Sequence, residues 1–311
     1  MRLTRSGFTV PELLVATAVA GIATALMTLT VVRQQRFFSS ASEIIGVRSQ
    51  LRDAADILAS DIRGASVSSL GLPVMTDTAV ELYTTIASSV ACGPPVSGTI
   101  GLPPSALITG PTLTSILAQP DTGDIVSIYV VPPTTPDSAR WESYRIGAFA
   151  VRSLATSCPS STRFTTPGDN YVGATGFALT LASPPGPDVG RGALIRFLRR
   201  ARYSLYKSSD GEWYLGYRRC STGSSPSCAS IQPVSGPYRA FKGSTSPAGI
   251  AFRYYDANGA VLASSAQSTL VSRIDIVLRG ETASSVALAG DTRRVWHDSV
   301  VVSVSPRNRS R

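Results

Sequence analysis

The side chains that could carry out catalysis are few, and their spacing matches no known catalytic motif. The one histidine, His297, lies between Trp296 and Asp298 in a segment that we predict to be a strand, where adjacent side chains point to opposite faces. A Ser-His-Asp site can be assembled from distant residues, yet the sequence has no nucleophile elbow, P-loop or dinucleotide fingerprint. We therefore expect that the protein is not an enzyme and that it binds no cofactor.

The cysteines have the chemistry of disulfides rather than of a metal site. There are four, Cys92, Cys158, Cys220 and Cys228, and no CxxC motif joins any two of them. Four cysteines allow three pairings, and the short loop between Cys220 and Cys228 favours joining these two, which leaves Cys92 for Cys158. Such bonds would place this part of the chain in an oxidising compartment, whereas free buried thiols are the alternative. We expect no metal.

The basic residues are nearly all arginine, and they give the chain a formal net charge of +9. One cluster alternates with the aromatic residues Phe197, Tyr203 and Tyr206. That pattern is compatible with phosphate contacts and base stacking, so these arginines are candidate nucleic-acid contacts. The competing interpretation is a solvated sheet face whose arginines meet acidic neighbours. The candidates are Arg196, Arg199, Arg200 and Arg202, and further arginines occur at 218, 219, 307, 309 and 311.

The most informative segment is the N-terminus. Two arginines precede Ser6-Gly7, the aromatic Phe8 follows, and Glu12 is the one acid before 20 uncharged residues, Leu13–Val32. Such a run, if helical, spans roughly 30 Å, the thickness of the hydrocarbon core of a bilayer. In an ordinary signal peptide the cleavage site follows the apolar run. Here the small residues precede it, so processing would leave the apolar helix on the protein.

This arrangement resembles the class III signal of the type IV pilin family. The resemblance implies cleavage between Gly7 and Phe8 by a prepilin peptidase, and N-methylation of Phe8. Glu12 then corresponds to the family's glutamate, which pairs with the amino terminus of a neighbouring subunit in the filament core. Pro11 departs from the pattern, but proline is tolerated in a first helical turn. A plain membrane anchor is the alternative, in which Glu12 lies among the headgroups and near the positive end of the helix dipole.

The helix is expected to continue beyond the membrane. Apolar residues recur at intervals of three, four and seven through residues 33–63, the pattern of one buried helical face, and Gly64 is a plausible stop. A coiled coil is less favoured because the stretch that follows a heptad pattern is too short. The sequence therefore predicts one helix of about 55 residues. The expected face consists of Phe37, Ala41, Ile44, Ile45, Leu51, Ala55, Leu58 and Ile62.

Beyond residue 64 the composition predicts β structure with long loops. Asp210-Gly211 and Asn258-Gly259 indicate tight turns between strands. Proline-rich stretches predict loops at 88–123, 132–140 and 183–192. The predicted strands are Val80–Ile86, Ile125–Val131, Glu142–Ala148, Leu194–Tyr206, Trp213–Arg218, Ile250–Asp256, Leu270–Leu278 and Val295–Val304.

These elements predict an α+β fold, with the long helix packed on an antiparallel sheet. The expected organisation is a leader at 1–7, a membrane or filament-core helix at 8–32, its amphipathic continuation at 33–64, and one β-rich extracytoplasmic domain at 65–311. The length also permits two domains, but we favour one. The resemblance implies the pilin-like version of this fold.

The C-terminal half resembles a subgroup of the same family. The strand-turn-strand around Asp210-Gly211, the segment GIAFRYYDANG at 249–259, and an ending that contains Arg307-Asn308 are similar to W-type minor pilins and to J-type minor pseudopilins of type II secretion. The resemblance implies a structural subunit that primes or joins filament assembly. Its partners would be other pilins, the prepilin peptidase and, before assembly, the bacterial inner membrane. After assembly the chain would belong to a pilus or pseudopilus, in the periplasm or at the cell surface. The alternative is a filament-displayed adhesin or DNA-uptake module.

Overall fold

The computed structural model describes residues 9–67, 70–132, 134–220, 228–241, 247–263, 265–287 and 292–307. Its first element is the expected helix, α1 (Val10–Gly64), which is 55 residues long. Pro11 lies in the first turn, where its missing N–H has no partner to lose. The helix ends at Gly64 as predicted, and Ala65 is already extended.

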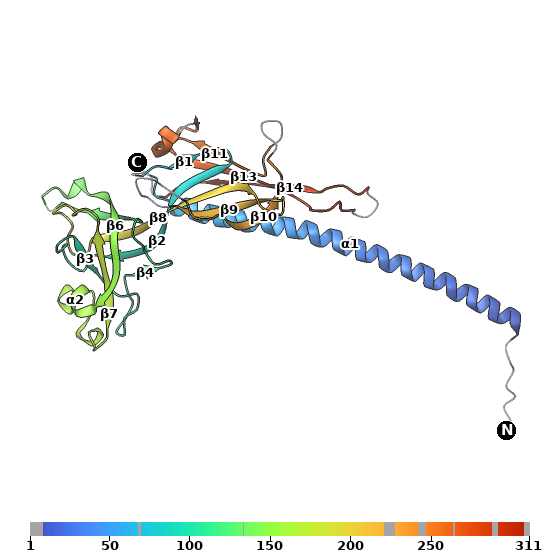
Figure 1. Cartoon of the computed structure of the whole chain (residues 1–311), viewed down its shortest axis with the longest axis horizontal. Helices are drawn as coiled ribbons and strands as arrows, with labels where there is room; N and C mark the ends of the chain where they lie inside the picture. Colours follow the sequence, from blue (N-terminus) through green and yellow to red (C-terminus); the bar gives the residue numbers. More distant parts are fainter. Residues whose placement is uncertain are drawn as a thin grey trace, which may run out of the picture.

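The two halves of α1 have different surroundings (Figure 1). The N-terminal half extends away from the rest of the molecule, whereas the C-terminal half packs against β2, β10, β13 and β14. Burial on the helix begins at Ser40 and follows a single stripe to Ile62. The described chain is therefore an apolar helix joined to a β-rich globular part.

Two residues of the expected apolar face are in fact exposed. Phe37 is 47% exposed because it precedes the point at which the sheet begins to cover the helix. Ile45 is 66% exposed because its neighbour Ile44 already faces the sheet, and adjacent helical positions are about 100° apart. Val47, which the periodicity did not assign to this face, is buried.

In the described part of the chain, the β structure is one antiparallel sheet of 14 strands with several branches. The main path runs β12-β11-β13-β10-β9-β8-β5-β6-β7-β3, while β2 pairs with β8 and β14 pairs with β13. The strands are β1 (Val74–Met75), β2 (Ala79–Val90), β3 (Thr99–Leu102), β4 (Ser115–Ile116), β5 (Ile125–Val130), β6 (Arg140–Ser153), β7 (Thr175–Leu181), β8 (Leu194–Lys207), β9 (Trp213–Cys220), β10 (Gln232–Tyr238), β11 (Ile250–Tyr255), β12 (Val261–Leu262), β13 (Arg273–Glu281) and β14 (His297–Val304). Short helices are α2 (Leu154–Ser157), η1 (Pro136–Ser138), η2 (Ser160–Thr162), η3 (Pro167–Asp169) and η5 (Ser265–Leu270).

Every strand that the sequence predicted is present, with shifted ends. β13 begins at Arg273 rather than at Leu270, because Leu270 completes the short helix η5. The predicted loop at 88–123 is partly wrong, because β2 continues to Val90 and both β3 and β4 lie within it. The strands β1, β3, β4, β7, β10 and β12 were not predicted.

Both predicted turns are confirmed. Gly211 and Gly259 have φ values of +91° and +83°, which a residue with a side chain rarely adopts. Asp210 accepts a bond from Glu212 N at 2.9 Å in the turn between β8 and β9. Asp256 does the same for Asn258 N in the turn between β11 and β12. The short polar side chain and the glycine together close each hairpin.

The described residues contain two main hydrophobic cores. The helix-packed core joins the α1 stripe to β2, β8, β9, β11, β13 and β14. The distal core joins β3, β5, β6 and β7 to the other ends of β2 and β8, and no α1 residue belongs to it among the described residues. Figure 1 shows β3, β6, β7 and α2 beyond the C-terminal end of the helix.

The long strands β2 and β8 connect the two cores. Phe197 of β8 lies in the distal core, whereas Tyr203 lies in the helix-packed core. The register of β2 against β8 shifts between Thr85 and Ala87, at the place where one core gives way to the other. A bulge bends a strand and increases its local twist. This bulge accounts for the change in direction between the two parts.

Candidate functional sites on the helix and along strand β8

Glu12 lies in the first turn of α1 and is bonded within that turn. The N–H and the hydroxyl of Thr9 both donate to Glu12 Oε2 at 2.9 Å, and the bond from the N–H is the half of a capping box that the Glu12 side chain supplies. Among the described residues, no partner is recorded for the other carboxylate oxygen, Oε1. Gly7 and Phe8, the predicted cleavage and methylation residues, lie outside the described residues.

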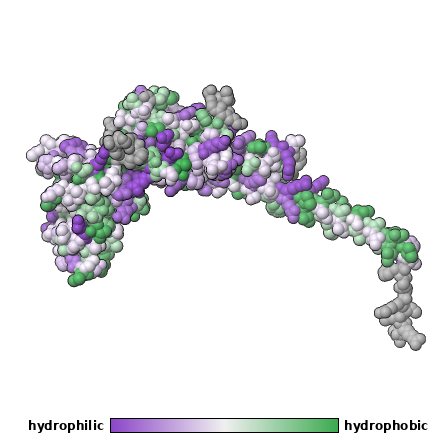
Figure 2. Space-filling model, viewed as in Figure 1, coloured by the Kyte–Doolittle hydropathy of each residue, from purple (hydrophilic) through white to green (hydrophobic). Residues whose placement is uncertain are grey.

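The helix from Val10 to Val32 presents an almost wholly apolar and exposed surface. Side chains on every side of it, such as Val15, Ile22 and Met27, are 60–70% exposed. In Figure 2 the outer part of the helix is mostly green and white, and hydrophilic side chains gather closer to the globular part. In the sequence, Arg33 and Arg36 follow the apolar run. The helix is long and apolar enough to cross a membrane, by length and composition.

The threonine hydroxyls in this segment are hydrogen-bonded to carbonyls of the same helix, so they need no water as a partner. Thr17 donates its hydroxyl to Leu13 O at 3.0 Å, and Thr24 donates to Ala20 O at 2.8 Å. Thr28 and Thr30 make the same bond to the carbonyl four residues earlier. A hydroxyl satisfied inside its own helix adds no unpaired polar group to an apolar environment. Composition alone did not indicate this feature.

Polar contacts fix the position of α1 on the sheet. Arg48 Nε lies 3.0 Å from Asp298 Oδ2, and its guanidinium lies over the Trp296 ring, 5.1 Å from the centroid. Gly280 lets the helix approach, because a Cβ at this position would lie 2.6 Å from Val47 Cγ1. Near the other end, Tyr203 of β8 donates a 2.5 Å bond to Asp61.

Burial dominates the electrostatics of that last contact. Desolvation raises the pKa of Asp61 despite the hydrogen bond from Tyr203. The pKa of Tyr203 is also raised, mainly by burial and in addition by the adjacent carboxylate of Asp61. Tyr203 therefore remains a neutral donor, and the bond holds the last turns of α1 against β8.

Arg199 of β8 forms a buried ion pair. Its Nη2 lies 2.8 Å from Asp124 Oδ2, and the two side chains are 11% and 5% exposed. The same nitrogen donates to Gln119 O at 2.8 Å, and Nε donates to Asp124 Oδ1 at 3.2 Å. Arg219 of β9 lies close to the same carboxylate, at 3.8 Å. Arg199 lies between the two cores along β8, since it follows Phe197 of the distal core and precedes Tyr203 of the helix-packed core.

Arg200 is also committed to a carboxylate. It pairs with Glu81 of β2, and the two side chains are 14% and 2% exposed. Burial lowers the pKa of Arg200, with a further contribution from Arg202. That Arg199 and Arg200 contact nucleic acid stays a prediction, but their carboxylate partners favour the competing interpretation, in which the arginines meet acidic neighbours. Their charges are neutralised by residues distant in the sequence, and their side chains are largely covered.

The other two candidate arginines have different positions. The Arg202 neighbours across the sheet are Glu81 on β2 and Arg218 on β9. Arg196 lies over the Trp141 ring at 4.5 Å from the centroid. Among the interleaved aromatics, Phe197 and Tyr203 are 1% and 4% exposed, so neither is a surface on which a base could stack. The structure does not bring the four arginines together as one face.

The expected disulfide pairing is present. Cys92 is bonded to Cys158, and Cys220 is bonded to Cys228. Cys220 is the last residue of β9, and it also pairs with Cys228 through an isolated antiparallel β-bridge. Glu81 lies near this disulfide, but two bonded cysteines offer no thiolate to a metal.

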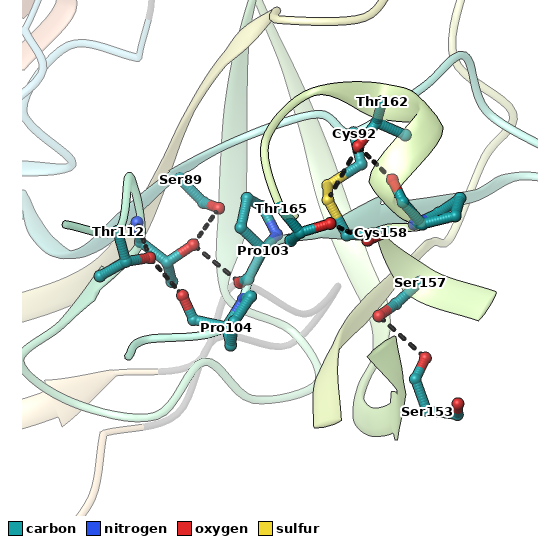
Figure 3. Close-up of a disulfide and its surroundings, with 12 residues drawn as sticks. Ser89, Cys92, Pro103, Pro104, Thr112, Ser153, Ser157, Cys158, Thr162 and Thr165 are labelled. Atoms are coloured by element: carbon teal, nitrogen blue, oxygen red, sulfur yellow. Dashed lines mark hydrogen bonds between the residues drawn. A yellow bond between two sulfur atoms is a disulfide. The ribbon is translucent and has the colours of Figure 1, made fainter. Parts of the chain in front are cut away.

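The first disulfide stabilises the loops of the distal part (Figure 3). It joins the loop after β2 to the end of α2, across 66 residues, and such a closure contributes about 4 kcal/mol in the chain-entropy model. Thr165 donates to Cys158 O at 2.9 Å on the same side. Ser89 and the neighbouring Thr114 share a 2.8 Å hydrogen bond, and Thr114 donates to Pro103 O.

Among the residues that the structure describes, His297 takes part in no triad-like arrangement. Its ring Nδ1 lies 3.5 Å from Glu281, its partner on β13, and its side chain is 54% exposed. Asp298 points to the opposite face, where it pairs with Arg48. The alternation expected from the strand is therefore observed.

Comparisons with known proteins do not identify this chain. No protein-family model, curated protein or solved structure matches it. Any assignment of function must therefore come from the residues and the geometry.

Proposed function

We propose that this chain is a minor subunit of a type IV pilin-like filament, either a type IV pilus or a type II secretion pseudopilus. The observation that carries the proposal is the division of α1. Its first half exposes apolar side chains on all sides, while its second half is packed on a sheet. An apolar helix that is continuous with a folded part can leave a bilayer and enter a bundle of identical helices without refolding.

The first turn of the helix supports the same function. In a filament core, Glu12 would receive the free amino terminus of a neighbouring subunit. Thr9 occupies only Oε2 of the carboxylate, so Oε1 could accept a bond from that amine. In a plain anchor the carboxylate would only cap the helix, whereas in a filament core it would also meet a partner of opposite charge.

The distal part favours a position at the end of the filament. Subunits whose helices stack along an axis have further subunits above them. The part formed by β3, β5, β6 and β7 extends past the C-terminal end of α1, into the space that the next subunit would occupy (Figure 1). A subunit of this shape fits best at the tip, where it would prime assembly.

A second candidate function is binding at that tip. The distal part exposes large apolar side chains on its loops, among them Val172, which is fully exposed, and Leu117, which is 84% exposed. Isolated exposed apolar residues are common, but those at the far end of a displayed subunit could contact a surface. The alternative of DNA uptake is weaker, because Arg199 and Arg200 are paired with Asp124 and Glu81.

Fractionation and labelling would test the proposed function. We expect the protein in sheared filaments, with immunogold label confined to one end of each filament. Deleting the gene should reduce filament number or secretion, and which of the two falls identifies the machine. A protein found only in the membrane fraction, with filaments and secretion unchanged after deletion, would contradict the proposal.

A further inference from the structure

Three arginines from distant segments line one cavity at the junction of the two cores. Arg63 comes from the last turn of α1, Arg196 from β8, and Arg307 from the segment after β14. The cavity has a volume of about 430 Å³. Ser60, Gly64 and Thr85 complete its lining, and none of the described residues that line it is acidic.

The backbone around the cavity is fixed by hydrogen bonds. Arg307 N donates to Arg63 O at 3.1 Å, which brings the two arginines together. The Thr85 hydroxyl donates to Gly64 O at 3.3 Å, which ties β2 to the end of the helix. The guanidinium of Arg196 lies over Trp141, so its plane is held by a half-buried ring. The backbone that carries Arg63 and Arg307 and the guanidinium plane of Arg196 are therefore fixed around the cavity.

Two of the three arginines in this cavity, Arg63 and Arg307, differ from the buried arginines of β8 in how their charge is compensated. Arg199 and Arg200, the neighbours of Arg196 along the chain, each have a buried carboxylate partner. Arg63 and Arg307 have no carboxylate within ion-pair distance among the described residues. The helix dipole favours cations at this end of α1, but it supplies only about half of one negative charge.

We propose that this cavity binds the phosphate group of a small anionic ligand. Guanidinium groups bind phosphate and carboxylate oxygens through paired, charge-assisted hydrogen bonds. One carboxylate would neutralise only one of Arg63 and Arg307, whereas a phosphate group carries about −1.5 to −2 at neutral pH and can match both. The Ser60 and Thr85 hydroxyls add further polar groups to the lining.

The geometry favours a small ligand over a nucleic-acid strand. A strand needs a row of cations that follows its backbone. Here the arginines converge on one cavity, and the two that would extend the row along β8 are occupied by Asp124 and Glu81. Figure 2 shows hydrophilic side chains gathered where the two parts of the molecule meet.

Titration of the full-length protein with inorganic phosphate would test the proposal. The protein would be held in uncharged detergent micelles, and calorimetry would be carried out against chloride of equal ionic strength. We expect saturable binding of one phosphate per chain. The Arg63→Gln/Arg307→Gln variant should bind at least about tenfold more weakly, because two charge-assisted contacts are lost.

A matched control keeps the net charge of that variant. Arg152→Gln/Arg253→Gln removes two exposed arginines remote from the cavity and should bind phosphate as the unmodified protein does. If the first variant fails to fold by circular dichroism, the single Arg307→Gln variant, altered only at an exposed residue, carries the same test.

Three results would overturn the proposal. The first is the absence of saturable phosphate binding, and the second is equal weakening in the control. The third is tight binding of a single-stranded oligonucleotide that phosphate does not displace, which would place the anionic ligand on another surface. None of these results bears on filament assembly, so they leave the proposed function to its own test.

Discussion

Replacing Asp124 with alanine should lower the free energy of unfolding by about 3–5 kcal/mol, because it leaves Arg199 as a buried charge without its partner. The arginine cannot turn to water, since its side chain is 11% exposed and lies between the two cores. Denaturant unfolding of the purified protein in detergent, followed by tryptophan fluorescence, would measure the effect.

Asp121 offers a matched control three residues away. Its side chain is 62% exposed, and it pairs with Arg219 at 3.0 Å across water-accessible surface. Such a pair contributes about 1 kcal/mol or less, so Asp121→Ala should be nearly neutral. The double variant Asp124→Leu/Arg199→Met removes both charges and should recover most of the lost stability. Equal stability of the Asp124→Ala and Asp121→Ala proteins would refute the structural role of the buried pair.

Replacing Glu12 with leucine should abolish incorporation into filaments while leaving the protein in the membrane. The apolar run is lengthened by the change, so insertion should not suffer. In the filament core, however, the amino terminus of the neighbouring subunit would lose its carboxylate and remain an unpaired buried charge. That penalty is several kcal/mol, which corresponds to a loss of at least about a hundredfold in incorporation.

The neighbouring variant Thr9→Val separates this effect from helix capping. It removes the hydroxyl bond to Glu12 but keeps both the carboxylate and the Thr9 N–H bond. We expect this protein to be incorporated normally. Quantitative immunoblots of sheared filaments and of membranes would give the incorporated fraction for each variant. Normal incorporation of the Glu12→Leu protein would rule out the pairing proposed for the carboxylate.

The helix could be predicted closely because its signals are local. The uncharged run, the spacing of Leu51, Leu58 and Ile62, and the stop at Gly64 each depend on residues within a few turns. The sequence could not show where the sheet begins to cover the helix. Phe37 therefore appeared to belong to the buried face, although it precedes the part of the helix that the sheet covers.

The strands were predicted where apolar residues alternate or β-branched residues cluster. β7 was missed because Gly176 and the small residues around it weaken the pattern, and β10 was missed because it contains two prolines and a glycine. The two cores were also invisible, since β8 reads as one continuous strand and the end of β2 was assigned to a loop. Only the pairing register reveals the bulge that divides them.

The arginines of β8 show why a charge pattern alone does not define a site. In the sequence, Arg199 and Arg200 look like part of one basic cluster. Their partners lie 75 and 119 positions away, and no local pattern links them. The cavity residues Arg63, Arg196 and Arg307 are equally remote from one another, so their convergence becomes visible only in the folded chain.

The central claim, that the N-terminus is that of a pilin-like subunit, is tested most directly by the intact mass of the protein extracted from membranes. The account predicts a chain that begins at Phe8, with the first seven residues removed and one methyl group added to the new amino terminus. A chain that retains its leader, or one cleaved after the apolar run near residue 32, would contradict it.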